Sequence, residues 1–447
     1  NQILLPLIEA VLLVIGLQKK IIKLFMIMLS LKHGVLRIKT IMVFLLQANC
    51  IENSMQQSKL LGILFFLNLC FIASVFSQKR IPVFISGEDG YKNYRIPAII
   101  KAANNDLLAF CEGRVASSND FGNVDIVMKR STDQGKTWSK LDIIVNNDSL
   151  QAGNSAPVLD LYDPEFPEGK IYLFYNTGNN HEGEVRKGNG LREVWYKTSI
   201  DNGFTWSEGV NITTQTHRPN YPQVSSTYNF KEDWRSYANT PGHGLQILQG
   251  IYRGRIFIAA NHSSGAPLPN FMDYNAHAYY SDDHGKTFHL SESLKTQGSN
   301  EATAAALSNG RLILNTRNQQ GDKKNRIVAI SNNGGMNWDT THFDENLPDP
   351  VCQGSLLNIG RYKNKEMLAF INAADTKNRN NLTLRISKDE GLSWFKNIII
   401  DKTNDEKQIS DYTAYSDLVL LKRNKLGVLY EKENYSIIVY TIINWGN

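Results

Sequence analysis

The sequence predicts an all-β fold, a six-bladed β-propeller. Three observations support this prediction: a short polar pattern recurs five times, short strand-like runs surround each copy, and long helical periodicity is absent after about residue 80. Many short strands with a corner motif at blade-sized intervals favour a propeller, because a closed ring of blades leaves no long strand edge exposed.

The recurring pattern first appears as STDQGKTWS, from Ser131 to Ser139, and reads Ser-x-Asp-x-Gly-x-Thr-Trp with small departures in later copies. An Asp side chain can bond to its own backbone two residues on, the Gly allows positive φ, and the aromatic ring packs back on the strand pair. Nothing in this corner can carry out covalent chemistry, so we expect a structural role for it and a functional site elsewhere. The five copies, called Asp-boxes below, begin at Ser131, Ser199, Ser281, Ser331 and Ser387.

Strand-like runs fill the rest of residues 80–447, for example DIVMKRS, KIYLFYN, RLILNTR and LTLRIS. At about 40 to 60 residues per blade, this length supplies roughly six four-stranded blades. The Asp-boxes are unequally spaced, which indicates one repeated unit with loops of different length, and a blade can lack a copy.

The N-terminal region has two different parts. Residues 1–54 are apolar stretches broken by charges, whereas MQQSKLLGILFFLNLCFIASVFSQ, from Met55, has the basic start, apolar run and small final residues of a secretory signal peptide. We interpret residues 1–54 as upstream translated sequence outside the fold, 55–77 as the signal peptide and 78–447 as the propeller of a secreted or periplasmic protein. The alternative is an uncleaved membrane anchor, although the apolar run is short for a span.

Composition excludes several classes of partner. The chain carries a net charge of +5, but residues 1–77 hold seven Lys or Arg and two Glu, which leaves 41 basic and 41 acidic residues for the propeller. A balanced domain is a poor candidate for binding nucleic acid or an anionic membrane. Only Cys111 and Cys352 follow residue 77, so the propeller has at most one disulfide, and no CxxC or HExxH spacing predicts a metal site.

The candidates for chemistry are charged residues and one tyrosine near strand-like runs. Taken singly, each has a plainer interpretation as an edge-strand arginine, a turn-forming aspartate or a core tyrosine. The candidates are Arg95 in NYRIPAII, Arg114 and Asp120 in CEGRVASSNDFG, Glu301 and Arg317 in NEATAAALSNGRLILNTRN, Arg379 in NRNNLTLRIS, Tyr415 in AYSDLVLL and Glu431 in GVLYEKEN.

Taken together, in this order and between the Asp-boxes, these residues resemble the exo-α-sialidase (neuraminidase) family of six-bladed propellers over essentially all of residues 80–447. The resemblance implies that Arg95, Arg317 and Arg379 clamp the carboxylate of the substrate. It further implies that Glu431 orients the first of these arginines and that Arg114 lines the pocket.

The same resemblance assigns the reacting groups. Asp120 would be the acid/base, Tyr415 the nucleophile and Glu301 the base beside it. In TPGHGLQIL, Gln246 would lie near the glycerol or N-acetyl end of the sugar, although a structural Gly-rich turn explains this stretch equally well. His243 and His262 are left as loop residues without a role.

The chemistry of sialic acid fits this set of residues. Its carboxylate is attached to the anomeric carbon, where three guanidiniums can grip it bidentately. An attacking carboxylate would be repelled by about 4 kcal/mol at about 4 Å and an effective dielectric of about 20, whereas a neutral phenol avoids this repulsion. Glu301 would take the phenolic proton, and Asp120 needs a raised pKa, expected from burial under the bound sugar.

The sequence therefore predicts a monomeric exo-α-sialidase that needs no cofactor and no metal. It would hydrolyse terminal α-ketosidically linked sialic acids from sialylated glycans, glycoproteins or gangliosides, with retention through a tyrosyl intermediate. We expect no nucleic-acid partner and no membrane contact of the mature domain. Two alternatives stay open: a non-catalytic Asp-box propeller that acts as a binding module, and a trans-sialidase.

Overall fold

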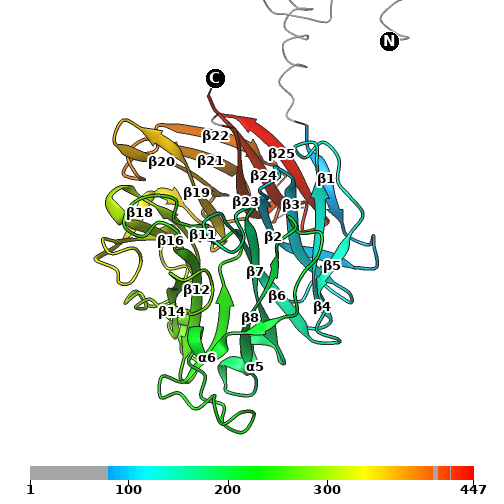
Figure 1. Ribbon diagram of the computed structural model, residues 1–447, viewed down its shortest axis with the longest axis vertical. Helices are drawn as coiled ribbons and strands as arrows, with labels where there is room; N and C mark the ends of the chain where they lie inside the picture. The colour runs from blue at the N-terminus through cyan, green and yellow to red at the C-terminus, as the bar shows by residue number, and fades with distance from the viewer. Residues whose placement is uncertain (1–78, 406–410, 423, 447) are drawn as a thin grey trace, which may run out of the picture. The chain divides into compact units, whose positions relative to one another are not determined.

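The computed structural model in Figure 1 describes residues 79–405, 411–422 and 424–446. The expectations for residues 1–54 and 55–77, and the predicted start of the propeller at residue 78, lie outside these residues. In the described part strands dominate, and no helix there is long and apolar enough to cross a membrane. The predicted all-β fold is confirmed.

Among the described residues, strand pairing gives six antiparallel blades, as predicted; five have four strands, and blade 3 has a short fifth strand. Blades 1 and 2 share one sheet through a single parallel pair, Val124 with Gln151. Blade 1 consists of β2 (Asn93–Lys101), β3 (Leu107–Arg114), β4 (Val124–Ser131) and β5 (Asp142–Val145). Blade 2 consists of β6 (Gln151–Asp160), β7 (Lys170–Gly178), β8 (Arg192–Ser199) and β9 (Val210–Asn211), with the short helices α5 (Glu182–Arg186) and α6 (Thr213–Thr216) in and after it.

The next two blades follow the same order from the innermost strand outward. Blade 3 consists of β10 (Trp234–Asn239), β12 (Ile256–Ser264), β13 (Tyr274–Ser281) and β14 (His289–Leu290), with β11 (Leu245–Gln246) paired to β12 and a 3₁₀ turn η2 at Pro269–Phe271. Blade 4 consists of β15 (Ser299–Ala306), β16 (Leu312–Asn318), β17 (Asn325–Ser331) and β18 (Thr340–Pro348), with a 3₁₀ turn η3 at Ser308–Gly310.

The last blade closes the ring with the first strand of the chain. Blade 5 consists of β19 (Gly354–Tyr362), β20 (Lys365–Ala373), β21 (Leu382–Ser387) and β22 (Lys396–Asp401). Blade 6 consists of β23 (Thr413–Lys422), β24 (Lys425–Lys432), β25 (Ile437–Asn444) and β1 (Ile81–Ile85). In Figure 1 the blades follow one another around an axis from blue to red, and blue β1 lies beside red β25. The two ends of the propeller are thereby held in one sheet.

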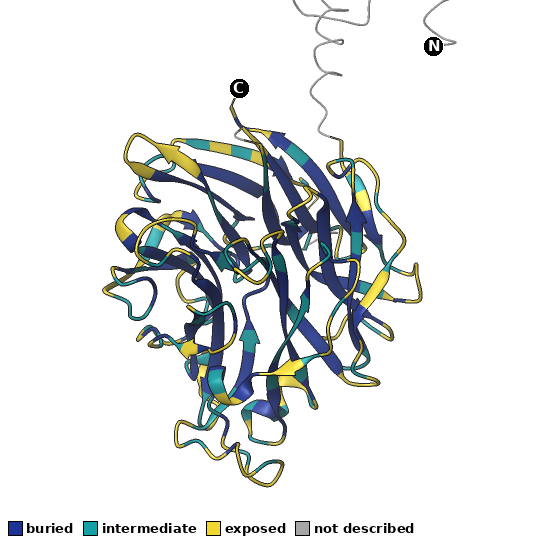
Figure 2. Ribbon diagram, in the orientation of Figure 1, coloured by how far each residue is buried: buried dark blue, intermediate teal, exposed yellow. Residues whose placement is uncertain are grey.

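The hydrophobic core lies between neighbouring blades. One cluster joins residues of β20 and β21 to residues of β24 and β25, and each further interface has a similar cluster. Because both faces of an inner strand are covered, β3 is buried along its whole length, whereas the outer β9 and much of β18 are exposed. In Figure 2 the exposed yellow colour lies mainly on loops and the periphery of the propeller. Cys111 and Cys352 are buried free thiols.

Each Asp-box follows the third strand of a blade, in blades 1 to 5. In the first copy the Ser131 hydroxyl donates to Asp133 at 2.8 Å and accepts the amide of Gly135 at 2.8 Å. Asp133 accepts the amide and hydroxyl of Thr137 at 2.9 and 2.8 Å. Gly135 has φ +85° and packs so closely on Tyr440 that a Cβ atom would lie 2.0 Å from the ring. The boxes are self-contained corners, as predicted.

The Asp-boxes also define the two ends of every blade. Ser131 lies opposite Leu107, at one end of β3, while Arg114 ends the same strand at its other end. Ser331 lies opposite Leu312, and β16 likewise runs away from its box to Arg317 and Asn318. We call the end of each blade that carries the Asp-box the box end, and the opposite end, where Arg114 and Arg317 lie, the site end.

Candidate active site

Three candidate side chains, Arg95, Glu301 and Tyr415, lie at β-bulges at the site end. On β2, Arg95 lies opposite Glu112 and Ala98 opposite Phe110, so three steps on one strand match two on the other. The same mismatch surrounds Glu301 on β15 and Tyr415 on β23. A bulge turns side chains out of the regular pleat. These bulges are the local reason why the residues leave the sheet surface.

The first bulge is strained. Ile96, between Arg95 and Pro97, has φ +62°, a conformation that is costly for a β-branched residue. Its amide donates to Glu431 at 2.8 Å, and Glu431 also accepts Arg95 Nε at 2.8 Å and the amide of Tyr415 at 3.1 Å. The fully buried Glu431 thus fixes both bulged strands from β24.

Tyr415, Glu301 and Arg317 make direct contact. The Tyr415 hydroxyl donates to Glu301 Oε1 at 2.6 Å, and Arg317 Nη1 donates to Glu301 Oε2 at 2.7 Å and to the Tyr415 oxygen at 3.0 Å. Burial and then the charge of Glu301 hold the pKa of Tyr415 well above its usual value, although Arg317 and Arg379 oppose this. The phenol is therefore neutral, and a carboxylate is in place to take its proton.

Three guanidiniums surround this tyrosine. Arg95 and Arg379 lie 5.3 and 5.5 Å from the centroid of the Tyr415 ring, and Arg317 bonds to its oxygen. Burial alone would lower the pKa of Arg95, but Glu431 raises it above its usual value. The structure thus brings together the three arginines that the sequence predicted as a clamp. Arg385, close to Arg379 in sequence, instead lies within β21 and bonds to Asn372 at 2.9 Å.

Tyr435 belongs to this cluster but was missed by the sequence analysis. Its hydroxyl accepts Arg379 Nη1 at 3.0 Å and donates to Asp411, and its ring centroid lies 3.9 Å from the guanidinium of Arg95. It therefore holds two of the arginines from the loop between β24 and β25. The stretch KENYS contains nothing that distinguishes this tyrosine from others on a rim.

Arg114 and Asp120 form the other side of the candidate site. Arg114 is buried against Glu112 at 2.6 Å, and its Nη1 lies 2.8 Å from Asp120 Oδ1. The Asp120 side chain is 74% exposed, compared with 2% for Arg114. Desolvation raises the pKa of Asp120, but the charges of Arg114 and Arg95 outweigh it and lower the pKa. The protein alone therefore gives the opposite of the raised pKa expected under a bound sugar.

The prediction that Gln246 lies near the sugar is wrong. Gln246 pairs with Ile256, and Ile256 pairs with Ser281, the first residue of the third Asp-box. Its amide donates to Asp160 at 2.5 Å, and its oxygen accepts the amide of Leu161 at 2.8 Å. Gln246 is therefore at the box end, where its polar atoms stabilise a corner.

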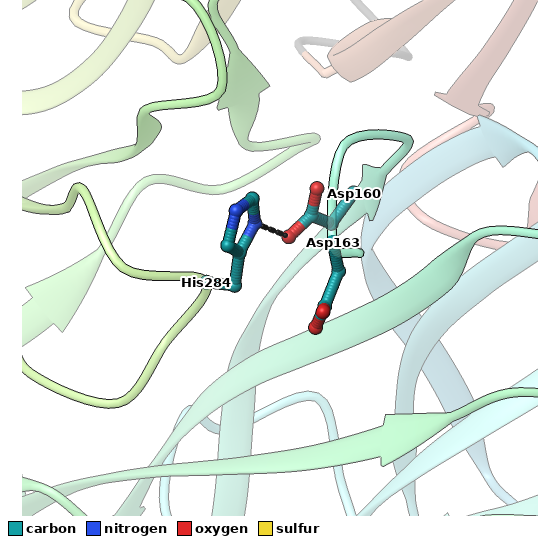
Figure 3. Close-up of side chains that lie close together, drawn as sticks. All are labelled: Asp160, Asp163 and His284. Atoms are coloured by element: carbon teal, nitrogen blue, oxygen red, sulfur yellow. Dashed lines mark hydrogen bonds and ion pairs between the residues drawn. The ribbon is translucent and has the colours of Figure 1, made fainter. Parts of the chain in front are cut away.

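Gln246 also borders the one group among the described residues with the spacing of a metal site, formed by Asp160, Asp163 and His284. Figure 3 shows His284 bonded to Asp160, at 2.8 Å, with Asp163 beside them. Asp163 Oδ2 also lies 3.4 Å from the ammonium of Lys170. Because a cation there would compete with Lys170, this group is better explained as a link between β6 and the third Asp-box.

Comparison with known proteins agrees with this architecture. The sialidase of Micromonospora viridifaciens is 29% identical over 368 residues, which cover 78% of this chain and 51% of that protein. The sialidase of Bacteroides fragilis is 28% identical over 376 residues, 77% of this chain and 61% of that protein. The chain thus spans between half and two thirds of these relatives.

Among solved structures, the Hadza microbial sialidase Hz136 has a similar fold, with a TM-score of 0.66 and 24% identity over 82% of this chain and 68% of that one. The BNR repeat-like domain family matches residues 105–428, which include five of the six blades' innermost strands and most candidate residues. The chain belongs to the BNR repeat-like domain family.

Proposed function

We propose that this chain is an exo-α-sialidase that hydrolyses terminal α-ketosidic sialic acids with retention of configuration. The observation that carries this proposal is the 2.6 Å contact between Tyr415 and Glu301 inside the cluster of three arginines. The sialidases among its relatives support the same activity.

The arginine cluster accounts for substrate recognition. A sialic acid carries a planar carboxylate on its anomeric carbon, and Arg95, Arg317 and Arg379 can bind it through paired hydrogen bonds. A carboxylate bound there would bring the anomeric carbon close to the phenolic oxygen of Tyr415, which itself accepts a hydrogen bond from Arg317. The uncharged phenol is suited to attack there, because a carboxylate nucleophile would be repelled by the substrate's own carboxylate.

The reaction then needs two proton transfers in its first step. Glu301 accepts the proton of Tyr415 as the phenolic oxygen bonds to the anomeric carbon, and Asp120 gives a proton to the departing glycosidic oxygen. A sugar over the exposed Asp120 would desolvate it and raise its pKa, against the effect of Arg114. In the second step Asp120 takes a proton from water, whose oxygen bonds to the anomeric carbon, while Glu301 returns its proton to the departing oxygen of Tyr415. Two inversions give net retention.

We assign this activity to residues 78–447, because every proposed residue lies there. The chain without residues 1–77 is expected to keep its full turnover. Loss of turnover in the shortened protein, with its circular dichroism spectrum retained, would contradict this assignment. Secretion through a signal peptide in residues 55–77 remains a proposal from the sequence, as do the sialylated glycan substrates.

The direct test is incubation with a fluorogenic α-ketoside of N-acetylneuraminic acid, with a β-galactoside of the same fluorophore as the control. We expect release of the fluorophore from the sialoside only. No release at any pH between about 4 and about 8 would favour a binding module instead. Chromatography of the products with lactose present distinguishes free sialic acid from sialyllactose, and hence hydrolysis from transfer.

A further inference from the structure

A loop of blade 3, Thr240–Gly244, is bonded to the innermost strands of its neighbours. This loop follows β10 and forms hydrogen bonds to other blades before the chain continues to β11 in blade 3. The Thr240 hydroxyl donates to the carbonyl of Ala302 in blade 4 at 2.5 Å, and the amide of Gly244 donates to Pro157 in blade 2 at 2.8 Å. We call this segment the central loop.

The central loop reaches blade 6 through a buried ion pair. Nδ1 of His243 lies 2.7 Å from Asp417 Oδ1, and the amide of His243 donates to Asp417 Oδ2 at 3.0 Å. Asp417 also accepts the Ser355 hydroxyl of blade 5 at 2.7 Å and the amide of Ile99 of blade 1 at 2.8 Å. One buried carboxylate therefore joins four blades.

The contact with Asp417 favours the charged form of His243. Burial lowers the pKa of His243, but the charge of Asp417 and its hydrogen bond raise it above the usual value overall. A buried carboxylate is costly without such a partner. Removal of the imidazole would leave Asp417 with only neutral donors.

Two glycines let the loop pack closely on its surroundings, one against Asp417 and one against blade 3. Gly242 has φ +106°, and a Cβ atom there would lie 3.0 Å from the Asp417 carboxylate. At Gly244 a Cβ atom would lie 2.4 Å from Ile258. A side chain at Gly242 would therefore push the loop away from Asp417, whereas one at Gly244 would push it away from Ile258 of blade 3.

The loop is directly connected to the segment that carries Tyr415. Gln353 donates to the carbonyls of Pro241 in the loop and Ser416 in β23, both at 3.0 Å, and it accepts the amide of Ser416 at 3.0 Å. Asp417 is the next residue of β23. The backbone on the C-terminal side of Tyr415 is thus held by the central loop and Gln353, while Glu431 holds the Tyr415 amide itself.

We propose that His243, acting through Asp417, is a positioning residue that keeps the Tyr415 hydroxyl against Glu301. The inference rests on the proposed function, in which that contact activates the nucleophile. His243 itself is not part of the arginine cluster. Its loss should therefore misplace the nucleophile and leave the binding of the carboxylate intact, because a small displacement of a reacting group is costly to the rate.

The test compares two histidine–aspartate pairs of similar length, 2.7 Å for His243 with Asp417 and 2.8 Å for His284 with Asp160. His243→Ala is expected to lower kcat on the fluorogenic sialoside by at least about tenfold with KM within about twofold. The matched control is His284→Ala, which breaks the pair with Asp160 at the box end. It should lower Tm but leave kcat per folded molecule unchanged. Equal kcat in both variants would overturn the proposal.

A second variant covers the case in which His243→Ala does not fold. Ser355→Ala removes one hydroxyl from Asp417 and is expected to lower kcat by about threefold at unchanged KM; an unchanged kcat would count against the role. A crystal structure of whichever variant folds adds a readout that needs no turnover. Tyr415 should have moved out of hydrogen-bond distance of Glu301, and an intact 2.6 Å contact would refute the positioning role even if the wild type were not a sialidase.

Discussion

The two ends of the blades use polar residues in different ways. Within the Asp-boxes at the box end, hydrogen bonds join residues two to four positions apart, as between Asp133 and Thr137, and the same turn is built five times. At the site end, the important bonds join distant parts of the chain, such as Arg95 to Glu431 and Glu301 to Tyr415. The box end repeats one hairpin turn, whereas the site end brings different side chains together in one place.

This difference shows which kind of sequence signal carries function in a repeat protein. A corner that satisfies its own hydrogen bonds can be copied in every blade without reference to the others. A reactive site needs a different side chain from each blade, so its residues have no common pattern. Substitutions at the site end should accordingly lower turnover, whereas substitutions at the box end should lower stability.

The largest effect is expected for Tyr415, the proposed nucleophile. Tyr415→Phe keeps the ring but removes the oxygen that bonds to Glu301, so kcat should fall by at least about 100-fold, a barrier increase of roughly 2.7 kcal/mol. Binding of a sialic acid analogue, measured by calorimetry, should persist because Arg95 and Arg379 are unchanged. A variant with near wild-type kcat would show that another group attacks.

Glu301→Gln should lower kcat to a similar extent, because the phenol keeps its proton when the base is absent. The double variant with Tyr415→Phe should be little worse than either single variant, as expected for two residues that act as a unit. Additive losses in steady-state kinetics would separate their roles.

A smaller effect, on stability only, is expected at the box end. Asp133→Ala should lower the free energy of unfolding by about 1 kcal/mol through lost turn hydrogen bonds, with kcat per folded molecule unchanged. Urea unfolding and active-site titration measure the two quantities. If kcat fell at unchanged stability, the box end would take part in the reaction.

The stability contribution of Asp133 should also depend on pH. The backbone hydrogen bond from Thr137 is the main cause that lowers the pKa of Asp133 to about 2. A lowered folded-state pKa stabilises the protein above the unfolded value, near 3.9, and this contribution is lost as pH falls toward about 2. The difference between wild type and Asp133→Ala should therefore shrink between about pH 4 and pH 2. A difference that is constant over this range would exclude the linkage.

The smallest effect is expected for metal removal. His284 is bonded to Asp160, and Asp163 is paired with Lys170, so EDTA should change neither kcat nor Tm. Calorimetry and the fluorogenic assay with and without added calcium provide the measurement. A fall in Tm that calcium reverses would show that this group holds a cation.

The sequence predicted the fold and most of the cluster because short motifs mark them. The Asp-boxes specify corners, and NYRIP contains both Arg95 and the proline that follows the bulged Ile96. Other parts depend on pairing that no local motif reveals. Tyr435 reaches Arg379 across 56 positions, and His243 reaches Asp417 across 174. Gln246 was misplaced because the register of β11 against β12 puts it at the box end, which its Gly-rich surroundings do not indicate.

The central claim is that Tyr415 forms a covalent bond to the sugar. The most direct test is proton NMR of the first sialic acid released from an α-sialoside by the wild-type protein, recorded before mutarotation. Two successive inversions through a tyrosyl intermediate predict the α-anomer as the first product. Release of the β-anomer would show a single inversion by water and would contradict the role assigned to Tyr415.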